Sequence, residues 1–227
     1  MRGLDRKSSR TDLVSDADRD AERLIADLLH RERPDDGLLG EEGAESAGRS
    51  GRRWVVDPLD GTTNFLYGFP AWSVSIALED DQGAAAAVVH DPSRDETFRA
   101  GRGAGAELNG EAMAVRRCDG LESALVATGF GYEPERRAAQ AEVLGRLLPQ
   151  IRDVRRAGSA ALDLSWLASG RLDAYYERGL KPWDWAAGRL LVTEAGGALR
   201  ELPGDPPGLV AAASEELMEA LAELLDG

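Results

Sequence analysis

The sequence predicts an α+β fold in which helices and sheets form layers. Segments typical of strands and of helices are mixed along the 227 residues, without the regular strand–helix–strand alternation of a parallel α/β sheet. Most strand-like segments follow one another between residues 37 and 101. No internal repeat and no low-complexity linker interrupts the chain. We therefore expect a single domain over residues 1–227.

The first element is a predicted helix over residues 16–29, with Ser15 or Asp16 as its N-cap. Pro34 and the following Asp-Asp-Gly end it. Its apolar residues recur at helical spacing: Ala17, Ala21, Leu24, Ile25 and Leu28.

Strands are predicted where short apolar runs lie between turn-forming residues. The alanine-rich run 84–90 is included because the turn signals at both of its ends bound it closely. The predicted strands are 37–42, 52–57, 71–80, 84–90, 96–101, 123–130 and 172–177.

Four more helices are predicted in the second half of the chain. The helix over 134–151 starts with a proline, and the helix over 159–170 has Ser159 near its start and Gly170 at its end. The other two cover 183–197 and 215–225. The glycine-rich segment 101–106 matches a loose dinucleotide-binding pattern, but Asn109-Gly110 follows and indicates a turn rather than a helix.

Composition narrows the possible partners. The formal net charge of −14 argues against a nucleic-acid or anionic-membrane surface, because phosphates would be repelled. No apolar run approaches the ~20 residues of a membrane helix. The basic N-terminus lacks the apolar run of a secretory signal, so we expect a cytoplasmic protein. Cys118 is the only cysteine, which excludes an intrachain disulfide and a thiolate metal cage.

The segment "WVVDPLDGTTNF", residues 54–65, carries the main chemical signal. Pro58 has no N–H group and is expected to end the strand at Asp57. Asp57, Asp60 and the Leu59 carbonyl can then face one cavity, where repulsion between the acids requires a cation or a proton. Oxygen donors of this kind suit Mg²⁺ or Mn²⁺. The alternative is a turn in which both acids only cap backbone N–H groups.

Further acids lie near the ends of predicted elements. Glu41 and Glu42 follow the strand that starts at residue 37, and Asp184 opens a helix. Several carboxylates could hold two or three cations, and paired cations suit in-line phosphoryl displacement. Each acid also has a simpler interpretation, as a solvated loop residue or as a helix-start acid favoured by the helix dipole.

These motifs, in this order, resemble the inositol monophosphatase family of Mg²⁺-dependent phosphatases. The resemblance is carried by "GEE" (40–42), "DPLDGTTNF" (57–65) and "WDWAAGRLLVTEAGG" (183–197), with weaker similarity at 11–18, 103–110, 155–162 and 173–177. It implies a layered αβαβα sandwich of the inositol monophosphatase/fructose-1,6-bisphosphatase type. The chain is expected to lack the first N-terminal helix of its relatives, either because its start is truncated or because a partner subunit covers that face.

The resemblance also implies metal and catalytic roles. Glu41, Asp57 and the Leu59 carbonyl would bind a first Mg²⁺. A second ion would be bound by Asp57, Asp60 and Asp184, and a third, weaker ion would contact Glu41. Glu41 and Thr62 would orient and deprotonate the attacking water, with Asp60 as a further catalytic residue. Asp12 and Asp18 match acids behind the metal site.

Substrate contacts are implied at a second set of residues. The N–H groups of Gly61 and Thr62 would bind the phosphate, near Asp60 and Asp184. Ser159, Ala160 and Glu177 would contact the alcohol part.

The sequence thus predicts a Mg²⁺-dependent phosphomonoesterase acting on inositol monophosphate or a similar polyol phosphate. Histidinol-phosphate phosphatase, fructose-1,6-bisphosphatase and 3′-phosphoadenosine phosphate phosphatase remain alternatives with the same chemistry. A non-catalytic regulator that kept the fold, or a protein whose acids bind structural Ca²⁺, is the alternative of another class. The family also suggests a homodimer, with a small-molecule phosphate monoester as its other partner.

Overall fold

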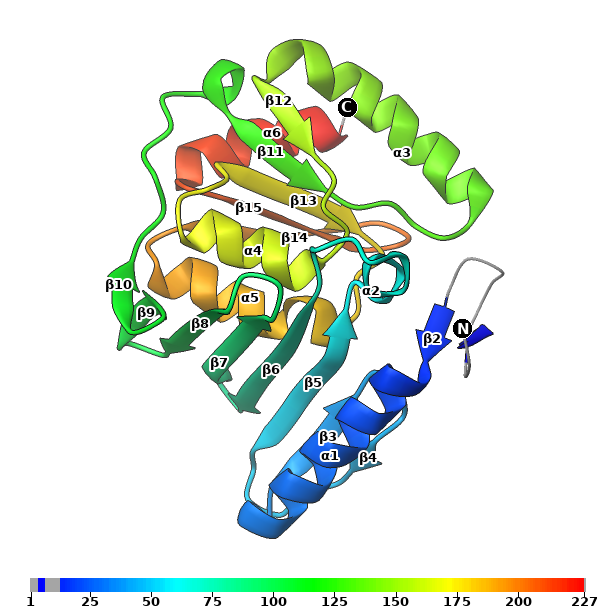
Figure 1. Cartoon of the computed structure of the whole chain (residues 1–227). Helices are drawn as coiled ribbons and strands as arrows, with labels where there is room; N and C mark the ends of the chain where they lie inside the picture. The colour runs from blue at the N-terminus through cyan, green and yellow to red at the C-terminus, as the bar shows by residue number, and fades with distance from the viewer. Residues whose placement is uncertain (1–3, 7–12, 227) are drawn as a thin grey trace.

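Two β-sheets and the helices packed on them make up the structure, a computed structural model that describes residues 4–6 and 13–226 (Figure 1). Asp12, one of the two acids expected behind the metal site, lies outside the described residues. In the described part, no helix is both long and apolar enough to cross a membrane.

The larger sheet has eight strands in the order β10-β9-β8-β7-β6-β5-β3-β4. Neighbouring strands are antiparallel except β3 and β5, which are parallel. The strands are β3 (Gly37–Gly40), β4 (Glu45–Ser46), β5 (Arg53–Asp60), β6 (Ser73–Asp80), β7 (Gly83–Asp91), β8 (Glu96–Gly101), β9 (Gly105–Leu108) and β10 (Glu111–Met113).

The smaller sheet has five strands in the order β12-β11-β13-β15-β14, where β11 is parallel to both neighbours. Its strands are β11 (Leu125–Thr128), β12 (Asp153–Arg155), β13 (Ala174–Arg178), β14 (Ala198–Leu202) and β15 (Gly208–Ala212). A separate ribbon pairs β1 (Leu4–Arg6) with β2 (Leu13–Ser15). Short 3₁₀ turns cover Leu121–Ser123 and Leu148–Gln150.

The helices complete five layers (Figure 1). Helix α1 (Asp16–Glu32) lies on the outer face of the large sheet, and α3 (Pro134–Leu147) and α6 (Glu215–Asp226) lie beyond the small one. Helices α4 (Ala160–Ala168) and α5 (Pro182–Glu194) lie between the two sheets. This order is the αβαβα sandwich that the sequence predicts.

The middle helices are apolar on nearly all sides because both sheets cover them. Leu162, Leu164 and Leu167 of α4 and Leu191 of α5 are fully buried. They belong to one core with inward-facing residues of both sheets. A second core, between the small sheet and α6, includes Leu221. The central core fixes the N-terminal ends of α4 and α5 relative to strand β5.

The structure corrects several predicted boundaries. Strand β5 does not end at Asp57: it continues to Asp60 through a bulge, because pairing with β6 resumes after Pro58. The turn at Asn109-Gly110 is confirmed, with both residues at positive φ, but it joins two strands, β9 and β10, that the sequence analysis missed. Strands β12, β14 and β15 were also missed. Helix α3 ends at Leu147, before Pro149, rather than at 151.

Close packing of α4 on α5 gives a test of this core. A Cβ on Gly188 of α5 would lie 2.5 Å from Leu164 Cδ1, so Gly188→Ala requires the helices to move apart. We expect the free energy of unfolding to fall by about 1–3 kcal/mol, despite alanine's better helix propensity. Gly145→Ala in α3, where nothing lies within 4 Å, is the control and is expected to stabilise slightly. Urea titration of both variants measures the difference, and equal effects would contradict the packing argument.

Candidate active site

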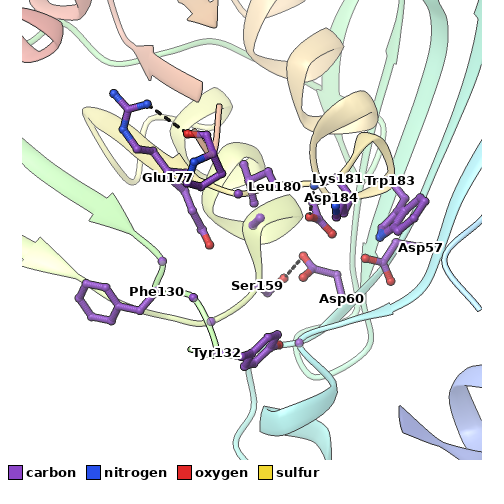
Figure 2. Close-up of a pocket in the computed structure, with 18 of the residues that line it drawn as sticks. Asp57, Asp60, Phe130, Tyr132, Ser159, Glu177, Leu180, Lys181, Trp183 and Asp184 are labelled. Carbon is purple, nitrogen blue, oxygen red and sulfur yellow. Dashed lines mark hydrogen bonds between the residues drawn. The ribbon is translucent and has the colours of Figure 1, made fainter. Parts of the chain in front are cut away.

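A pocket of about 690 Å³ lies where the end of β5 meets the first turns of α4 and α5 (Figure 2). Elements from both sheets contribute to its wall. It is lined by every residue to which the sequence analysis gave a metal, catalytic or substrate role: Glu41, Asp57, Leu59, Asp60, Gly61, Thr62, Ser159, Ala160, Glu177 and Asp184. The pocket thus brings together residues that are far apart in the sequence, from Glu41 to Pro207.

The bulge in β5 turns two acids toward this pocket. Between the Asp57–Ser75 and Asp60–Ser73 pairs, β5 contains one more residue than β6. The Leu59 N–H donates to Asp57 Oδ1 at 3.0 Å, which fixes the turn that Pro58 begins. Asp57 is almost fully buried and Asp60 is 9% exposed. The irregular strand end is therefore what places the two carboxylates side by side.

Asp60 is held by the start of α4. Its Oδ2 accepts hydrogen bonds from Ser159 Oγ at 2.6 Å and from the Ala161 N–H at 2.7 Å. Ser159 is also the N-cap of α4, because its Oγ accepts a bond from the Leu162 N–H at 3.3 Å. The Ser159 hydroxyl, expected to contact substrate, is thus bonded inside the protein and orients Asp60.

Asp184 lies in the first turn of α5. Its Oδ2 accepts a hydrogen bond from the Lys181 N–H at 2.6 Å, within the first turn of the helix. A carboxylate is favoured there by the positive end of the helix dipole. The prediction that Asp184 is a helix-start acid is therefore confirmed. This position is compatible with metal binding, because the same side chain lines the pocket.

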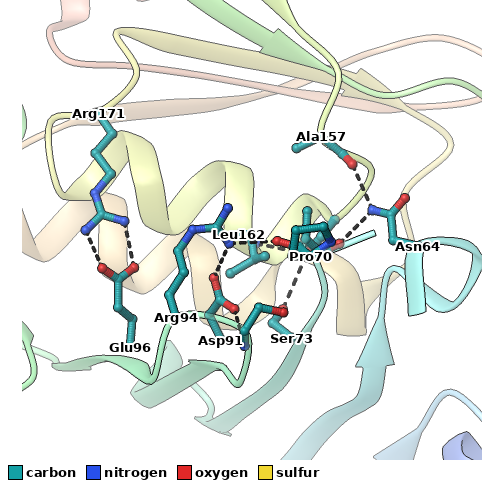
Figure 3. A network of polar contacts seen from close by, with 12 residues as sticks. Asn64, Pro70, Ser73, Asp91, Arg94, Glu96, Ala157, Leu162 and Arg171 are labelled. Atoms are coloured by element: carbon teal, nitrogen blue, oxygen red, sulfur yellow. Dashed lines mark hydrogen bonds and ion pairs between the residues drawn. The ribbon is translucent and has the colours of Figure 1, made fainter. Parts of the chain in front are cut away.

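The short helix α2 (Thr62–Tyr67) follows β5 directly. Gly61 has φ +94°, and a Cβ there would lie 3.0 Å from the Ala71 carbonyl oxygen. Asn64 Nδ2 donates to the carbonyls of Ala71 at 2.6 Å and Ala157 at 2.8 Å (Figure 3). Asn64 therefore fixes α2 against the loop that leads into α4.

Thr62 connects α1 to the pocket. Its hydroxyl lies 2.9 Å from Asp18 Oδ1 and 3.1 Å from the Leu59 carbonyl oxygen, and either atom can accept its single proton. Asp18 is fully buried and does not line the pocket itself. As expected, Asp18 lies behind the site, and it sets the direction of the Thr62 hydroxyl.

Glu41 reaches the pocket from the loop after β3, and Glu22 of α1 fixes that loop. The two carboxylate oxygens of Glu22 accept hydrogen bonds from the Glu42 and Ala44 N–H groups, both at 2.8 Å. Glu22 is only 5% exposed. A Cβ on Gly40 would lie 2.2 Å from Glu22 Oε2, so only glycine allows this approach. The sequence analysis did not identify Glu22, because its partners are backbone groups about 20 residues away.

Burial and mutual repulsion make the acids of the pocket hard to ionise. Burial raises the pKa of Asp57 well above its usual value, and Glu41, Asp60 and Asp184 raise it further. The pKa of Asp184 is raised well above its usual value for the same reasons. Burial raises the pKa of Asp60 to about 6, although its bonds from Ser159 and Ala161 oppose the shift. A positive charge in the pocket would lower all three pKa values.

Glu177 lies apart from these acids, on the side of the smaller sheet. Burial raises its pKa to about 7, while the hydrogen bond that Tyr175 donates at 2.7 Å opposes the shift. A Cβ on Gly129 would lie 1.9 Å from Glu177 Oε2, so Gly129 leaves the space this carboxyl occupies. Glu177 points toward the middle of the pocket in Figure 2.

A second group of pocket residues was not predicted from the sequence. They come from the segment after β11 up to the first turn of α3, from the loop after β12, and from the end of β13 and the loop that follows it. Several are basic or aromatic: Phe130, Tyr132, Arg136, Arg156, Arg178 and Lys181. No motif marks them, because residues gathered from several strand ends share no spacing in sequence.

The pocket fits a hard divalent cation by its donor type. Its acidic side offers the carboxylates of Glu41, Asp57, Asp60 and Asp184 and the Leu59 carbonyl, with no histidine or cysteine. Within residues 4–6 and 13–226, no three histidine, cysteine, aspartate or glutamate side chains are arranged as a ready metal cage. The donors face one pocket, and burial together with the neighbouring carboxylates raises the pKa values of Asp57, Asp60 and Asp184, an effect that a cation would offset.

The layer order and the acidic pocket define the class: a five-layer αβαβα protein with carboxylates at the helix N-termini between its two sheets. The model of the inositol monophosphatase family matches residues 2–226, and this chain belongs to that family.

Individual proteins are similar to most of this chain in sequence or in structure. A protein named Nus factor SuhB from Xylella fastidiosa is 49% identical over 199 residues, covering 87% of this chain and 72% of that protein. An inositol-1-monophosphatase from Mycobacterium leprae is 44% identical, covering 96% and 80%. The crystal structure of the extragenic suppressor protein suhB from Bartonella henselae matches with a TM-score of 0.92 at 39% identity, covering 98% of this chain and 87% of that one.

The Glu22 contacts predict how the Glu41 loop responds to mutation. Glu22→Gln removes the charge and replaces one acceptor oxygen by a donor, so one of the two N–H groups loses its partner. Because hydrogen bonds to charged groups contribute about 1.5–3 kcal/mol, we expect the amides of Glu42 and Ala44 to exchange with solvent about tenfold faster or more. Hydrogen exchange followed by NMR measures this. Glu32→Gln, at the exposed end of the same helix, should leave both amides unchanged, and unchanged exchange in Glu22→Gln would contradict the assignment.

The raised pKa values predict how Mg²⁺ affects stability. A carboxyl whose pKa is higher in the folded than in the unfolded protein destabilises the fold as pH rises through the folded pKa, because it must ionise while buried. Mg²⁺ should therefore raise the melting temperature more at pH 8, above the Asp60 value of about 6, than at pH 5. Calorimetry with and without Mg²⁺ measures this. An equal or larger effect at pH 5 would count against cation binding by these acids.

Proposed function

We propose that this protein is a Mg²⁺-dependent phosphomonoesterase that hydrolyses inositol monophosphate or a similar polyol phosphate. The observation that carries the proposal is the convergence of Glu41, Asp57, Asp60 and Asp184 on one pocket, where burial and mutual repulsion raise the pKa values of the three aspartates. Membership of the inositol monophosphatase family and the name of the Mycobacterium leprae relative support it.

In the proposed site, Glu41, Asp57, the Leu59 carbonyl, Asp60 and Asp184 would hold Mg²⁺ ions. When bound, these ions would supply Lewis acidity at the phosphoryl oxygens and at the attacking water. Mn²⁺ has the same preference for oxygen ligands. The protein's own contribution is to fix these donors through the β5 bulge, the two helix starts and the Glu22 contact.

The attacking water is oriented by Thr62 and Glu41. The Thr62 hydroxyl proton points to Asp18 or to the Leu59 carbonyl, which leaves the oxygen lone pairs free to accept a proton from water. A hydroxyl alone is a weak base, so Glu41 takes the proton. The N–H groups of Gly61 and Thr62, at the start of α2, bind phosphate oxygens.

The reaction replaces one phosphorus–oxygen bond by another. The water oxygen bonds to phosphorus while its proton passes to Glu41, the bond between phosphorus and the alcohol oxygen breaks, and that oxygen takes a proton from solvent water to leave as the free alcohol; Glu41 then returns its proton to solvent. Ala160 and Glu177 face the alcohol part. Ser159 acts mainly through Asp60, because its hydroxyl is already bonded to that carboxylate.

The alternatives concern the substrate and the class of function. Histidinol phosphate, fructose 1,6-bisphosphate and 3′-phosphoadenosine phosphate fit the same chemistry. A regulatory role without catalysis is kept open by the relatives named Nus factor SuhB, in Xylella fastidiosa and Salmonella typhimurium. The complete set of pocket acids favours catalysis, since a purely structural role does not need four carboxylates in one pocket. The homodimer and the cytoplasmic location remain predictions.

The proposal predicts the effect of removing one ligand. Asp57→Asn and Asp184→Asn each replace a carboxylate by a weaker, neutral donor, so phosphate release should fall by at least about a hundredfold, as expected when metal affinity and charge stabilisation are lost together. A Mg²⁺-dependent phosphate-release assay with inositol 1-phosphate measures this.

Asp153→Asn is the matched control, because Asp153 is exposed, pairs with Arg155 and lies outside the pocket. It should retain wild-type activity. Turnover close to wild type in either ligand variant would refute the metal assignment. A wild-type protein that binds Mg²⁺ but releases no phosphate from any small phosphate ester would favour the regulatory alternative.

A further inference from the structure

The pocket has two sides of different charge. Asp57 and Asp184 lie on one side, and Phe130 lies on the opposite side (Figure 2). The side that includes Phe130 also contains Arg156, from the loop between β12 and α4. Acidic residues outnumber lysines and arginines in this chain, 41 to 27, so an arginine on a pocket wall calls for a physical explanation.

Arg156 differs from the other arginines near the pocket. Arg136 pairs with Glu133 at 3.6 Å, Arg155 pairs with Asp153 at 2.7 Å, and Arg178 donates to the Pro203 carbonyl at 2.9 Å. Arg156 is exposed and has no ion pair or hydrogen bond to any residue in 4–6 and 13–226. Its guanidinium lies 5.8 Å from the Phe130 ring centre, a cation–π contact that leaves the edge N–H groups available.

The position of Arg156 places it beside the alcohol part of a substrate. A Cβ on Gly158 would lie 2.4 Å from Arg156 Nη1, so the guanidinium lies over the backbone just before Ser159 and Ala160. Its charge also acts on Glu177, whose pKa it lowers against the effect of burial. Arg156 therefore faces the half of the pocket that would contain the leaving alcohol.

We propose that Arg156 sets substrate preference by charge, favouring phosphate esters whose alcohol part carries a second anionic group, a phosphate or a carboxylate. This inference rests on the proposed phosphatase function. A guanidinium binds such groups with two parallel N–H···O bonds, which a neutral hydroxyl cannot match. An ammonium group on the alcohol would be repelled.

A simpler role for Arg156 is to offset the negative charge of Glu177 and of Asp163, a buried acid of α4 whose pKa it also lowers. In that case its removal would change the turnover of all substrates by a similar factor. The two roles are therefore separated by comparing how the variants change the turnover of substrates whose alcohol parts differ in charge.

The test measures kcat/KM for three esters with Mg²⁺ present. Fructose 1,6-bisphosphate carries a second phosphate, inositol 1-phosphate has a neutral alcohol, and histidinol phosphate carries an amine. The variants are Arg156→Gln, Arg156→Lys and the neighbouring control Arg155→Gln, which removes an arginine that does not line the pocket. Thermal melting of each variant checks that it is folded.

We expect Arg156→Gln to lower the fructose bisphosphate to inositol phosphate ratio of kcat/KM about tenfold, without lowering the histidinol phosphate to inositol phosphate ratio. Arg156→Lys keeps the charge and should retain part of the preference, and Arg155→Gln should leave both ratios unchanged. Equal changes for all three substrates would overturn the proposal, as would wild-type activity on inositol phosphate with none on the bisphosphate. No hydrolysis of any substrate by the wild type would instead refute the phosphatase function.

Discussion

Repulsion between buried carboxylates is the constraint on which this structure depends. Asp57, Asp60 and Asp184 lie together in a pocket that water reaches only in part, and each has a raised pKa. Burying these carboxylates together costs free energy that an apolar core would not cost, so other contacts have to hold the arrangement in place. Each acid is fixed by backbone N–H groups: Leu59 for Asp57, Ala161 for Asp60 and Lys181 for Asp184. These bonds stabilise the charged form only in part, which leaves the pocket with a demand for positive charge.

The five-layer fold explains how such a pocket is supported. Helices α4 and α5 are buried between two sheets, so their N-termini have fixed positions and direct their first N–H groups and their dipoles at the end of β5. The bulge at Pro58 and Leu59 then turns the strand end into the same space. Contacts farther out, such as Glu22 with the Glu41 loop and Asn64 with the α4 loop, fix segments that have no regular structure. The rigid helices and the tethered loops together form one site.

Charge also divides the pocket. In the proposed function, the acidic side binds cations and, through them, a phosphate group, although the whole chain carries a net charge of −14. The opposite side, with Phe130 and Arg156, would face the remainder of the substrate. Relatives of this chain bear different names, inositol-1-monophosphatase and Nus factor SuhB. Differences in the loops that form this second side can change specificity without changing the acidic side.

The sequence by itself determined the fold class, most helices and the acidic half of the site. Periodic apolar residues mark α1, and short apolar runs between turn residues mark the strands β5 to β8. The Asp57-to-Asn64 segment carries its donors within eight residues, so the local sequence was sufficient there. Short edge strands such as β10 and β14 escaped notice because their residues have weak strand propensity and form strands only by pairing with neighbours. The positions of Glu22, Ser159 and Arg156 in the site were decided only by the tertiary structure. Each of these side chains contacts a residue or a pocket wall from a distant part of the chain. Such contacts produce no regular spacing that could be recognised in a single sequence.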